Sequence, residues 1–229
     1  MNRYVLRFQK LGNMRFISHL DLVRLFKRAI KKAGIKVAYS NGYNPHELIN
    51  VVQPLSLGYE SICEYFEIDT LISYDCAELV DKLNSSMPEG IIFTDCREKE
   101  RTSNNLSSAC ETALYEAVLP LKSDAAGQLP EFLAQDRILI IKKDKKTKKL
   151  VEKDIKDMIF SVEPQGLDPL VLKLMLRCAS NETLNPGKLL ESYFRFAGLD
   201  TDLSDCRIIR IDLLGKNSDG KLVSLYETF

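Results

Sequence analysis

Residues 3–34, RYVLRFQKLGNMRFISHLDLVRLFKRAIKKAG, decide the fold because they join an alternating strand to an amphipathic helix. From residue 3 to residue 9, large apolar side chains recur at every second position, which predicts a half-buried strand. Ser18, followed three residues later by Asp21, resembles a capping box and predicts the start of a helix. Gly34 predicts the end of that helix, because glycine readily adopts the left-handed conformation that closes helices.

The stretch up to residue 100 continues with further strands and a second helix. Strands are predicted at 35–40, within the extended region 48–69 and at 91–94, and a helix is predicted at 74–83. The resulting order is strand, helix, strand, strand, helix, strand. This is the split βαβ arrangement of ferredoxin-like domains.

After a polar linker at residues 98–108, the same order recurs. Strands are predicted at 113–121, 137–143, 170–178 and 206–214, and helices at 130–134 and 187–196. We therefore predict an α+β protein made of two tandem ferredoxin-like (βαββαβ) units, residues 1–100 and 110–229.

The composition is that of an ordinary globular protein, with 45% hydrophobic and 28% charged residues among 229. Charges in the first ten residues argue against a signal peptide, and no segment approaches the roughly 20 apolar residues of a membrane span. We therefore expect a cytoplasmic protein. The six cysteines form no CxxC pair, so the sequence predicts no metal centre and no cofactor. Nucleotide-hydrolysing, serine-hydrolase and zinc-protease motifs are also absent.

Charge is distributed unevenly along the first hundred residues, although the whole chain has a net charge of zero. Residues 1–46 contain ten cations and one acid, whereas residues 47–100 contain three cations and twelve acids. This asymmetry indicates an anionic ligand for the first segment. The alternative is that the two segments neutralise each other in the folded protein.

The predicted helix at 19–33 carries much of the positive charge in a stripe opposite its apolar face, with no acidic partner evident in the stripe. Such a stripe is typical of phosphate and nucleic-acid binding, although a solvated helix face explains it equally well. Arg15, just ahead of the first turn, could help to hold a phosphate there. The residues expected to bind nucleic acid are Arg15, Arg24, Lys27, Arg28, Lys31 and Lys32.

The only two histidines, His19 and His46, lie in polar, turn-rich segments. If they converged with Asp21, the three could act as acid and base in RNA cleavage or modification, or bind a metal. The alternatives are that His19 satisfies backbone groups at a buried helix start and that Asp21 caps the helix. The loop containing His46 also includes Tyr39, Ser40, Gly42, Asn44 and Pro45, where glycine and asparagine suit turns without any ligand.

A lysine-rich run at residues 142–149 lies between two strand-like segments and predicts a hairpin tip. It is either a soluble loop or a prong that contacts RNA.

The chain resembles a family of bacterial radical SAM-linked, or radical SAM-associated, proteins of unknown function. The resemblance lies in RFISHLDLVRLFKRAIKKAG (15–34), YSNGYNPH (39–46), LSLGYES (55–61) and, more weakly, EKDIKDMI (152–159). Glu47 departs from the residue expected after the second motif. The resemblance implies a B12-binding radical SAM protein as partner, which would hold the iron–sulfur cluster. It assigns no role to the motif residues.

Together these features lead to three functional hypotheses. The first is an accessory RNA-binding protein that presents ribosomal or transfer RNA to a radical SAM enzyme. The second is an RNA-cleaving or RNA-modifying enzyme that uses His19 and His46. The third is a structural adaptor of a radical SAM protein that binds no RNA.

Overall fold

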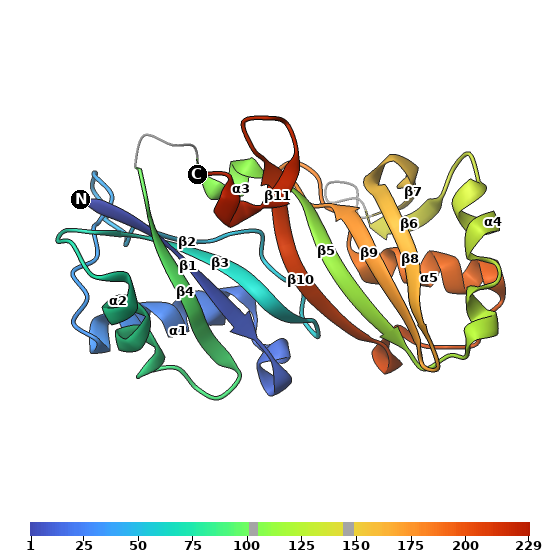
Figure 1. Cartoon of the computed structure of the whole chain (residues 1–229), viewed down its shortest axis with the longest axis horizontal. Coiled ribbons are helices and arrows are strands. Elements are labelled where there is room, and N and C mark those ends of the chain that lie inside the picture. Colours follow the sequence, from blue (N-terminus) through green and yellow to red (C-terminus); the bar gives the residue numbers. More distant parts are fainter. Residues whose placement is uncertain (101–104, 144–148) are drawn as a thin grey trace. The chain divides into compact units, whose positions relative to one another are not determined.

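The computed structural model describes residues 1–100, 105–143 and 149–229 (Figure 1). The chain forms two compact units: unit 1 contains Met1–Glu111 and Arg210–Phe229, and unit 2 contains Thr112–Ile209. This division differs from the predicted halves at the C-terminal end, because residues 210–229 group with the first unit. Within the described residues, no helix combines the length and apolar character needed to cross a membrane.

Unit 1 is built around a sheet in which β4, β1, β3 and β10 are neighbours in that order, with β2 paired to β3 and β11 paired to β10. Strand β1 runs antiparallel to both β3 and β4. The elements are β1 (Asn2–Lys10), η1 (Gly12–Phe16), α1 (His19–Lys32), β2 (Ile49–Val51), β3 (Glu60–Thr70), α2 (Cys76–Asn84), β4 (Ile91–Lys99), α3 (Leu106–Ala109), β10 (Arg207–Lys216, which begins in unit 2), β11 (Leu222–Ser224) and η5 (Leu225–Glu227).

The core of unit 1 forms where the apolar face of α1 packs against the sheet. Tyr4, Leu6 and Phe8 of β1 are completely buried, as their alternation predicted. Phe26 of α1 lies among three other phenylalanine rings, with centroids 5.2 Å from Phe8, 4.9 Å from Phe66 and 5.2 Å from Phe93. The predicted strand and helix at the start of the chain are thus confirmed, and their contact fixes the position of α1.

Charged residues are also buried in unit 1, chiefly on β3. Arg210 and Glu64 are each about 1% exposed, and Arg210 Nε donates a hydrogen bond to Glu64 Oε1 at 2.7 Å. Arg210 Nη2 donates to the other carboxylate oxygen of Glu64 and, at 2.7 Å, to the carbonyl oxygen of Gln53. Arg3 pairs with Asp69 at 2.7 Å. The acid-rich segment therefore neutralises part of the basic one, as the alternative interpretation proposed.

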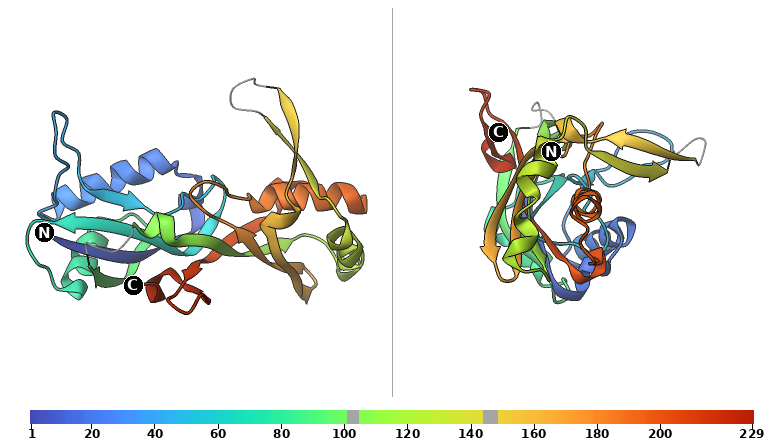
Figure 2. Two further views of the ribbon diagram at one scale, coloured as in Figure 1. Left: turned by 90° about the horizontal axis from the view of Figure 1, so that it is seen from above. Right: turned by 90° about the vertical axis from the view of Figure 1, so that its right-hand side faces the viewer.

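Unit 2 contains strands β5, β9 and β8 as antiparallel neighbours in that order, together with a separate two-stranded hairpin, β6–β7. The views in Figure 2 show this hairpin standing away from the other strands of the unit. The elements are β5 (Cys110–Leu119, which begins in unit 1), η2 (Ser123–Ala126), α4 (Leu129–Ala134), β6 (Leu139–Lys143), β7 (Leu150–Asp154), η3 (Lys156–Met158), β8 (Ile159–Leu167), β9 (Leu170–Arg177), α5 (Pro186–Ala197) and η4 (Leu203–Asp205).

The ends of α5, like those of α1, are set by residues close in sequence: a capping side chain at its start and a glycine at its end. The Asn185 side chain accepts a hydrogen bond from the Lys188 N–H group, and Gly198 ends the helix at φ 62°. The hairpin predicted around residues 142–149 has its two strands in β6 and β7. Residues 144–148 of its predicted tip lie outside the described residues.

A mixed helix-and-sheet protein with mostly antiparallel strands is confirmed, whereas a repeat of ferredoxin-like units is not. The predicted strand at 35–40 is wrong: this segment makes only two isolated bridges, Val37 to Thr70 and Tyr39 to Glu47, and the strand forms later, at β2. The two backbone groups of Ala38 bond to different segments: its N–H group donates to the carbonyl oxygen of Asp69, and its carbonyl oxygen accepts from the N–H group of Leu48. The segment therefore has no regular strand partner.

Candidate nucleic-acid interface

The start of α1 is fixed by a reciprocal cap. The Asp21 N–H group donates to Ser18 Oγ at 3.1 Å, and the Ser18 hydroxyl donates to the Asp21 carboxylate at 2.7 Å. Arg24 Nη1 donates to the other Asp21 oxygen at 2.9 Å. The hydrogen bonds from Ser18 and then Arg24 lower the pKa of Asp21. Asp21 is therefore engaged in capping, which was the structural alternative to its role as a catalytic acid.

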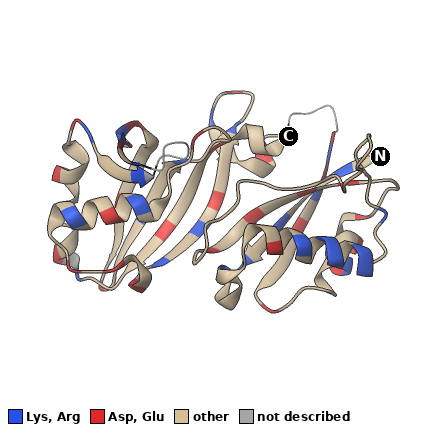
Figure 3. Cartoon of the chain, turned by 180° about the vertical axis from the view of Figure 1, so that it is seen from behind, with Lys and Arg blue, Asp and Glu red and all other residues tan. Residues whose placement is uncertain are grey.

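The basic stripe on α1 has acidic partners that the sequence did not reveal, so the predicted lack of partners is corrected for two of its members. Arg24 pairs with Asp21, and Lys27 Nζ pairs with Glu47 at 2.8 Å. The hydrogen bond from Lys27 is the main cause that lowers the pKa of Glu47. Arg28, Lys31 and Lys32 make no ion pair within the described residues. Figure 3 shows the Lys and Arg positions in blue succeeding one another along α1, the helix at the right of the picture.

The loop with the sequence YSNGYNPH (39–46) closes on itself. The Ser40 N–H group donates to the His46 carbonyl oxygen at 2.8 Å, and the His46 N–H group donates to Ser40 Oγ at 3.1 Å. The same hydroxyl lies 2.8 Å from His46 Nδ1. Gly42 has a φ of 126°, which a side chain at this position would resist. Ser40, Gly42 and His46 are thus explained by the loop's own geometry, while Asn44 and Pro45 lie exposed at its tip.

The structure does not bring His19 and His46 together. The Lys27–Glu47 ion pair fixes the base of the loop beside Lys27, eight residues and so about 12 Å along the helix from His19. In Figure 2 the segment after α1 rises beside the end of that helix. In the part of the chain that the structure describes, no three His, Cys, Asp or Glu residues gather in a way that could hold a metal ion.

His19 itself differs from both interpretations of the sequence. It faces the interior at the helix start, and its Nδ1 atom is buried with no hydrogen-bond partner among the described residues. The expectation that this nitrogen satisfies a backbone group is therefore not met. Arg15 lies in η1, ahead of the helix, where its guanidinium stacks over the Phe16 ring at 4.7 Å. It is separated from the cationic second half of α1.

A cavity of about 500 Å³ lies along the second half of α1 and the turn that follows it. We call it the basic cavity; it is lined by Lys27, Arg28, Ile30, Lys31, Gly34, Ile35, Lys36, Val37, Tyr39 and Glu47. Gly34 reverses the chain at φ 68°, so Lys36 returns beside the helix. Tyr39 is half exposed and adds an aromatic ring to the wall.

The cations, rather than the helix, determine the electrostatic potential of the basic cavity. Four cations and one carboxylate line it, and that carboxylate is paired with Lys27. The C-terminal end of a helix carries partial negative charge, which stabilises Lys31 and Lys32 but does not attract an anion. An anion in the cavity would therefore be held by the side chains of Arg28, Lys31 and Lys36. Sequence reasoning missed Lys36 and the inclusion of Tyr39 in this wall, because both depend on the turn at Gly34.

A family model described as "Uncharacterized protein conserved in bacteria (DUF2344)" matches residues 3–186, well over half of the chain. No curated protein matches. A solved structure described as a "putative glycine cleavage system transcriptional repressor" is 11% identical over 91% of this chain and 98% of that chain, with a TM-score of 0.24. A TM-score this low supports no argument about fold or function. The family match is decisive: the chain belongs to the DUF2344 family.

Proposed function

We propose that this member of the DUF2344 family is an accessory protein that binds single-stranded RNA in the cytoplasm through the basic cavity. The observation that carries the proposal is the meeting of Arg28, Lys31 and Lys36 with the half-exposed ring of Tyr39 in one cavity. Proteins bind single-stranded nucleic acids by combining cations, which contact the phosphates, with aromatic rings, on which the bases stack.

The cations and the aromatic ring occupy different parts of the wall of the basic cavity, so the phosphates and the bases of one RNA strand could each meet a suitable partner. Arg28, Lys31 and Lys36 make no ion pair within the described residues, so a phosphate would not have to displace an acid from them. Tyr39 lies at the cavity wall, and Tyr43 is fully exposed on the 39–46 loop. A nucleotide with its phosphate on the cations could place its base against Tyr39, and the neighbouring base could reach Tyr43. Stacking contributes about 1 to 3 kcal/mol per base.

Reversing three charges in the basic cavity should weaken RNA binding strongly. We expect Arg28→Glu, Lys31→Glu and Lys36→Glu together to lower the affinity for a short single-stranded RNA by at least about tenfold at 0.1 M salt. The dependence of affinity on salt should become shallower, by about 0.7 in log–log slope for each phosphate that the variant no longer neutralises. Fluorescence anisotropy titrations at several salt concentrations measure both quantities.

The matched control makes the same change of charge at Lys122, Lys173 and Lys221, which are exposed and lie outside the basic cavity. RNA affinity should fall much less in this variant. The basic-cavity variant should melt within a few degrees of the parent protein, since exposed charges contribute about 0.5 kcal/mol or less. The control should melt somewhat lower, because Lys173 lies opposite Glu116 and Glu163 on the neighbouring strands. Equal loss in the two variants would mean that only net charge matters. Absence of RNA binding by the parent protein would favour the structural adaptor.

The proposed radical SAM partner rests on the resemblance of the 15–34 and 39–46 motifs alone, and the family match does not bear on it. If the proposal is right, affinity-tagged chain purified under anaerobic conditions from its own cells should retain a B12-binding radical SAM protein, identified by mass spectrometry. A mock purification from untagged cells is the control. Recovery of RNA without any radical SAM protein would remove this part of the proposal and leave RNA binding in place.

We also retain the ferredoxin-like assignment as a proposal for unit 1. Its elements follow the order β1, α1, β2, β3, α2, β4. In the sheet, β1 lies between β4 and β3, and β2 pairs with β3. These pairings support the βαββαβ arrangement, and β2 is its shortest strand. An enzymatic role for His19 and His46 has no comparable support, because the two histidines do not share a site.

A further inference from the structure

Unit 2 contains a groove between the β6–β7 hairpin and α5, far in sequence from the residues of the basic cavity. It consists of two adjoining cavities of about 520 and 320 Å³, which share Ile140, Ile141, Leu150 and Lys188. We call it the hairpin groove. Along α5 its wall extends from Asn185 to Arg195, with Lys188, Glu191, Ser192 and Arg195 following one another at helical spacing.

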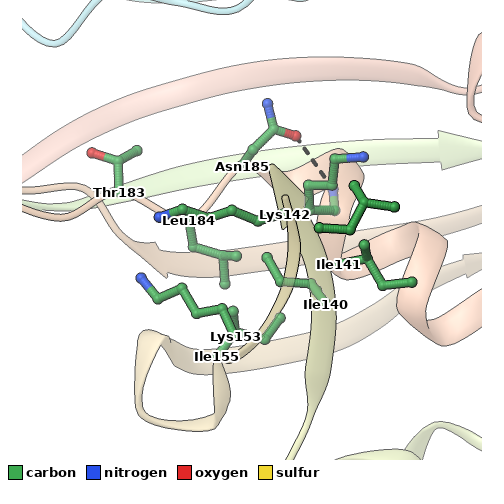
Figure 4. A pocket seen from close by; sticks show the side chains of 10 residues that line it. Ile140, Ile141, Lys142, Lys153, Ile155, Thr183, Leu184 and Asn185 are labelled. Carbon is green, nitrogen blue, oxygen red and sulfur yellow. Dashed lines mark hydrogen bonds between the residues drawn. The ribbon is translucent and has the colours of Figure 1, made fainter. Parts of the chain in front are cut away.

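The floor of the hairpin groove is apolar. Ile140, Ile155 and Leu184 are buried there, and Figure 4 shows their side chains near one another, with Lys153 extending outward from them. At the edge, Leu150 is 73% exposed and Ile141 is 47% exposed. A two-stranded hairpin is marginally stable without further packing, and exposed apolar residues beside an apolar groove mark interaction sites.

The rim of the hairpin groove is positively charged. Lys142, Lys153, Lys188 and Arg195 line it together with one acid, Glu191. Lys153 and Lys188 are held along the rim by ion pairs with Glu182 and Glu191, each at 2.7 Å. An apolar floor with a cationic rim complements a ligand that is apolar on one face and acidic at its edges.

The length of the hairpin groove indicates whether that ligand is helical or extended. Ten residues of α5 separate Asn185 from Arg195, a distance of about 15 Å, which matches about three turns of a docked helix. An extended peptide added to the edge of the hairpin would satisfy backbone groups but would leave the apolar floor uncovered. We propose that the hairpin groove binds an acidic amphipathic α-helix of a partner protein. The apolar residues of this helix at i, i+4 and i+7 lie on Ile140, Leu150 and Leu184. Its acids face Lys142 and Arg195, the rim cations that make no ion pair within the described residues.

A designed peptide tests this directly. The probe is a helical peptide of about four turns with leucine at i, i+4 and i+7 and glutamate at the remaining exposed positions, titrated against the full chain by fluorescence anisotropy. We expect Leu150→Glu to weaken binding at least tenfold, because it places a carboxylate against the apolar face of the helix and near the glutamates that flank this face. The control is Phe160→Glu, an apolar residue of unit 2 that is 46% exposed and lies outside the groove, which should change affinity less than twofold.

Charge and location provide the second half of the test. The same peptide with lysine in place of glutamate should bind at least tenfold more weakly, and the bound peptide should slow amide exchange in residues 139–142, 150–155 and 184–195. The proposal is overturned if the parent protein does not bind the acidic peptide, if Leu150→Glu leaves binding unchanged, or if an RNA oligomer or an extended peptide protects these residues instead. The triple charge reversal in the basic cavity should not affect this binding, so the two proposals can fail separately.

Discussion

Replacing Arg210 by methionine should lower the free energy of unfolding by about 3 to 5 kcal/mol, because the Glu64 carboxylate would remain buried without its partner. Arg210 supplies Glu64 with two hydrogen bonds and also satisfies the Gln53 carbonyl oxygen. Urea denaturation followed by circular dichroism measures the loss.

The double variant Glu64→Leu/Arg210→Met separates the cost of an orphaned charge from the contribution of the pair. Apolar replacement of both members of a buried ion pair is often neutral or stabilising, so the double variant should recover most of the lost stability. Recovery should remain incomplete, because the charged form of Lys10 loses the attraction of Glu64. A loss below about 1 kcal/mol in the single variant would contradict the burial of this pair.

The second large effect is expected in the core of unit 1. Changing Phe26 to alanine should destabilise the protein by about 3 to 5 kcal/mol, through lost burial and the cavity left among Phe8, Phe66 and Phe93. The same denaturation experiment reports the change, and tyrosine-region circular dichroism shows whether the tertiary packing survives.

Leu20→Ala is the matched control for Phe26→Ala. Leu20 lies on the same helix but is 66% exposed, so its truncation should change stability by about 0.5 kcal/mol or less. If both variants lost the same stability, burial of the Phe26 ring would not explain the result, and α1 would not be anchored through Phe26; helix propensity cannot cause the loss, because alanine has the highest propensity of all residues.

The sequence predicts those parts of the fold whose causes are local. The alternation from residue 3 to residue 9, the cap formed by Ser18 and Asp21, and the stop at Gly34 each depend on neighbours along the chain. The strand predicted at 35–40 failed because a strand also needs a partner in register. The segment meets the end of β3 only through the Val37 bridge to Thr70 and the hydrogen bond from Ala38 to Asp69, so its β-forming residues do not produce a regular strand.

In the candidate site too, the sequence predicts the residues placed by the helix itself and misses those placed by contacts with other segments. The helical projection identified Arg28 and Lys31 as outward-facing cations, and both line the basic cavity. It could not reveal the pairing of Lys27 with Glu47, twenty residues later, or the return of Lys36 to the cavity wall. Arg15 lies ahead of the helix, as the sequence predicts, but the sequence does not reveal that its guanidinium stacks over the Phe16 ring.

A ribosome must synthesise the chain as far as Tyr226 before unit 1 can form its full set of contacts. Arg210, which pairs with Glu64, follows it by 146 residues. Tyr226, whose hydroxyl donates to the carbonyl oxygen of Val5, follows Val5 by 221 residues. Unit 2 emerges in between as one continuous segment, free to fold earlier from contacts within itself. Unit 2 can therefore complete its set of contacts before unit 1 does. Until translation reaches β10, Glu64 lacks the arginine that pairs with it in the folded protein.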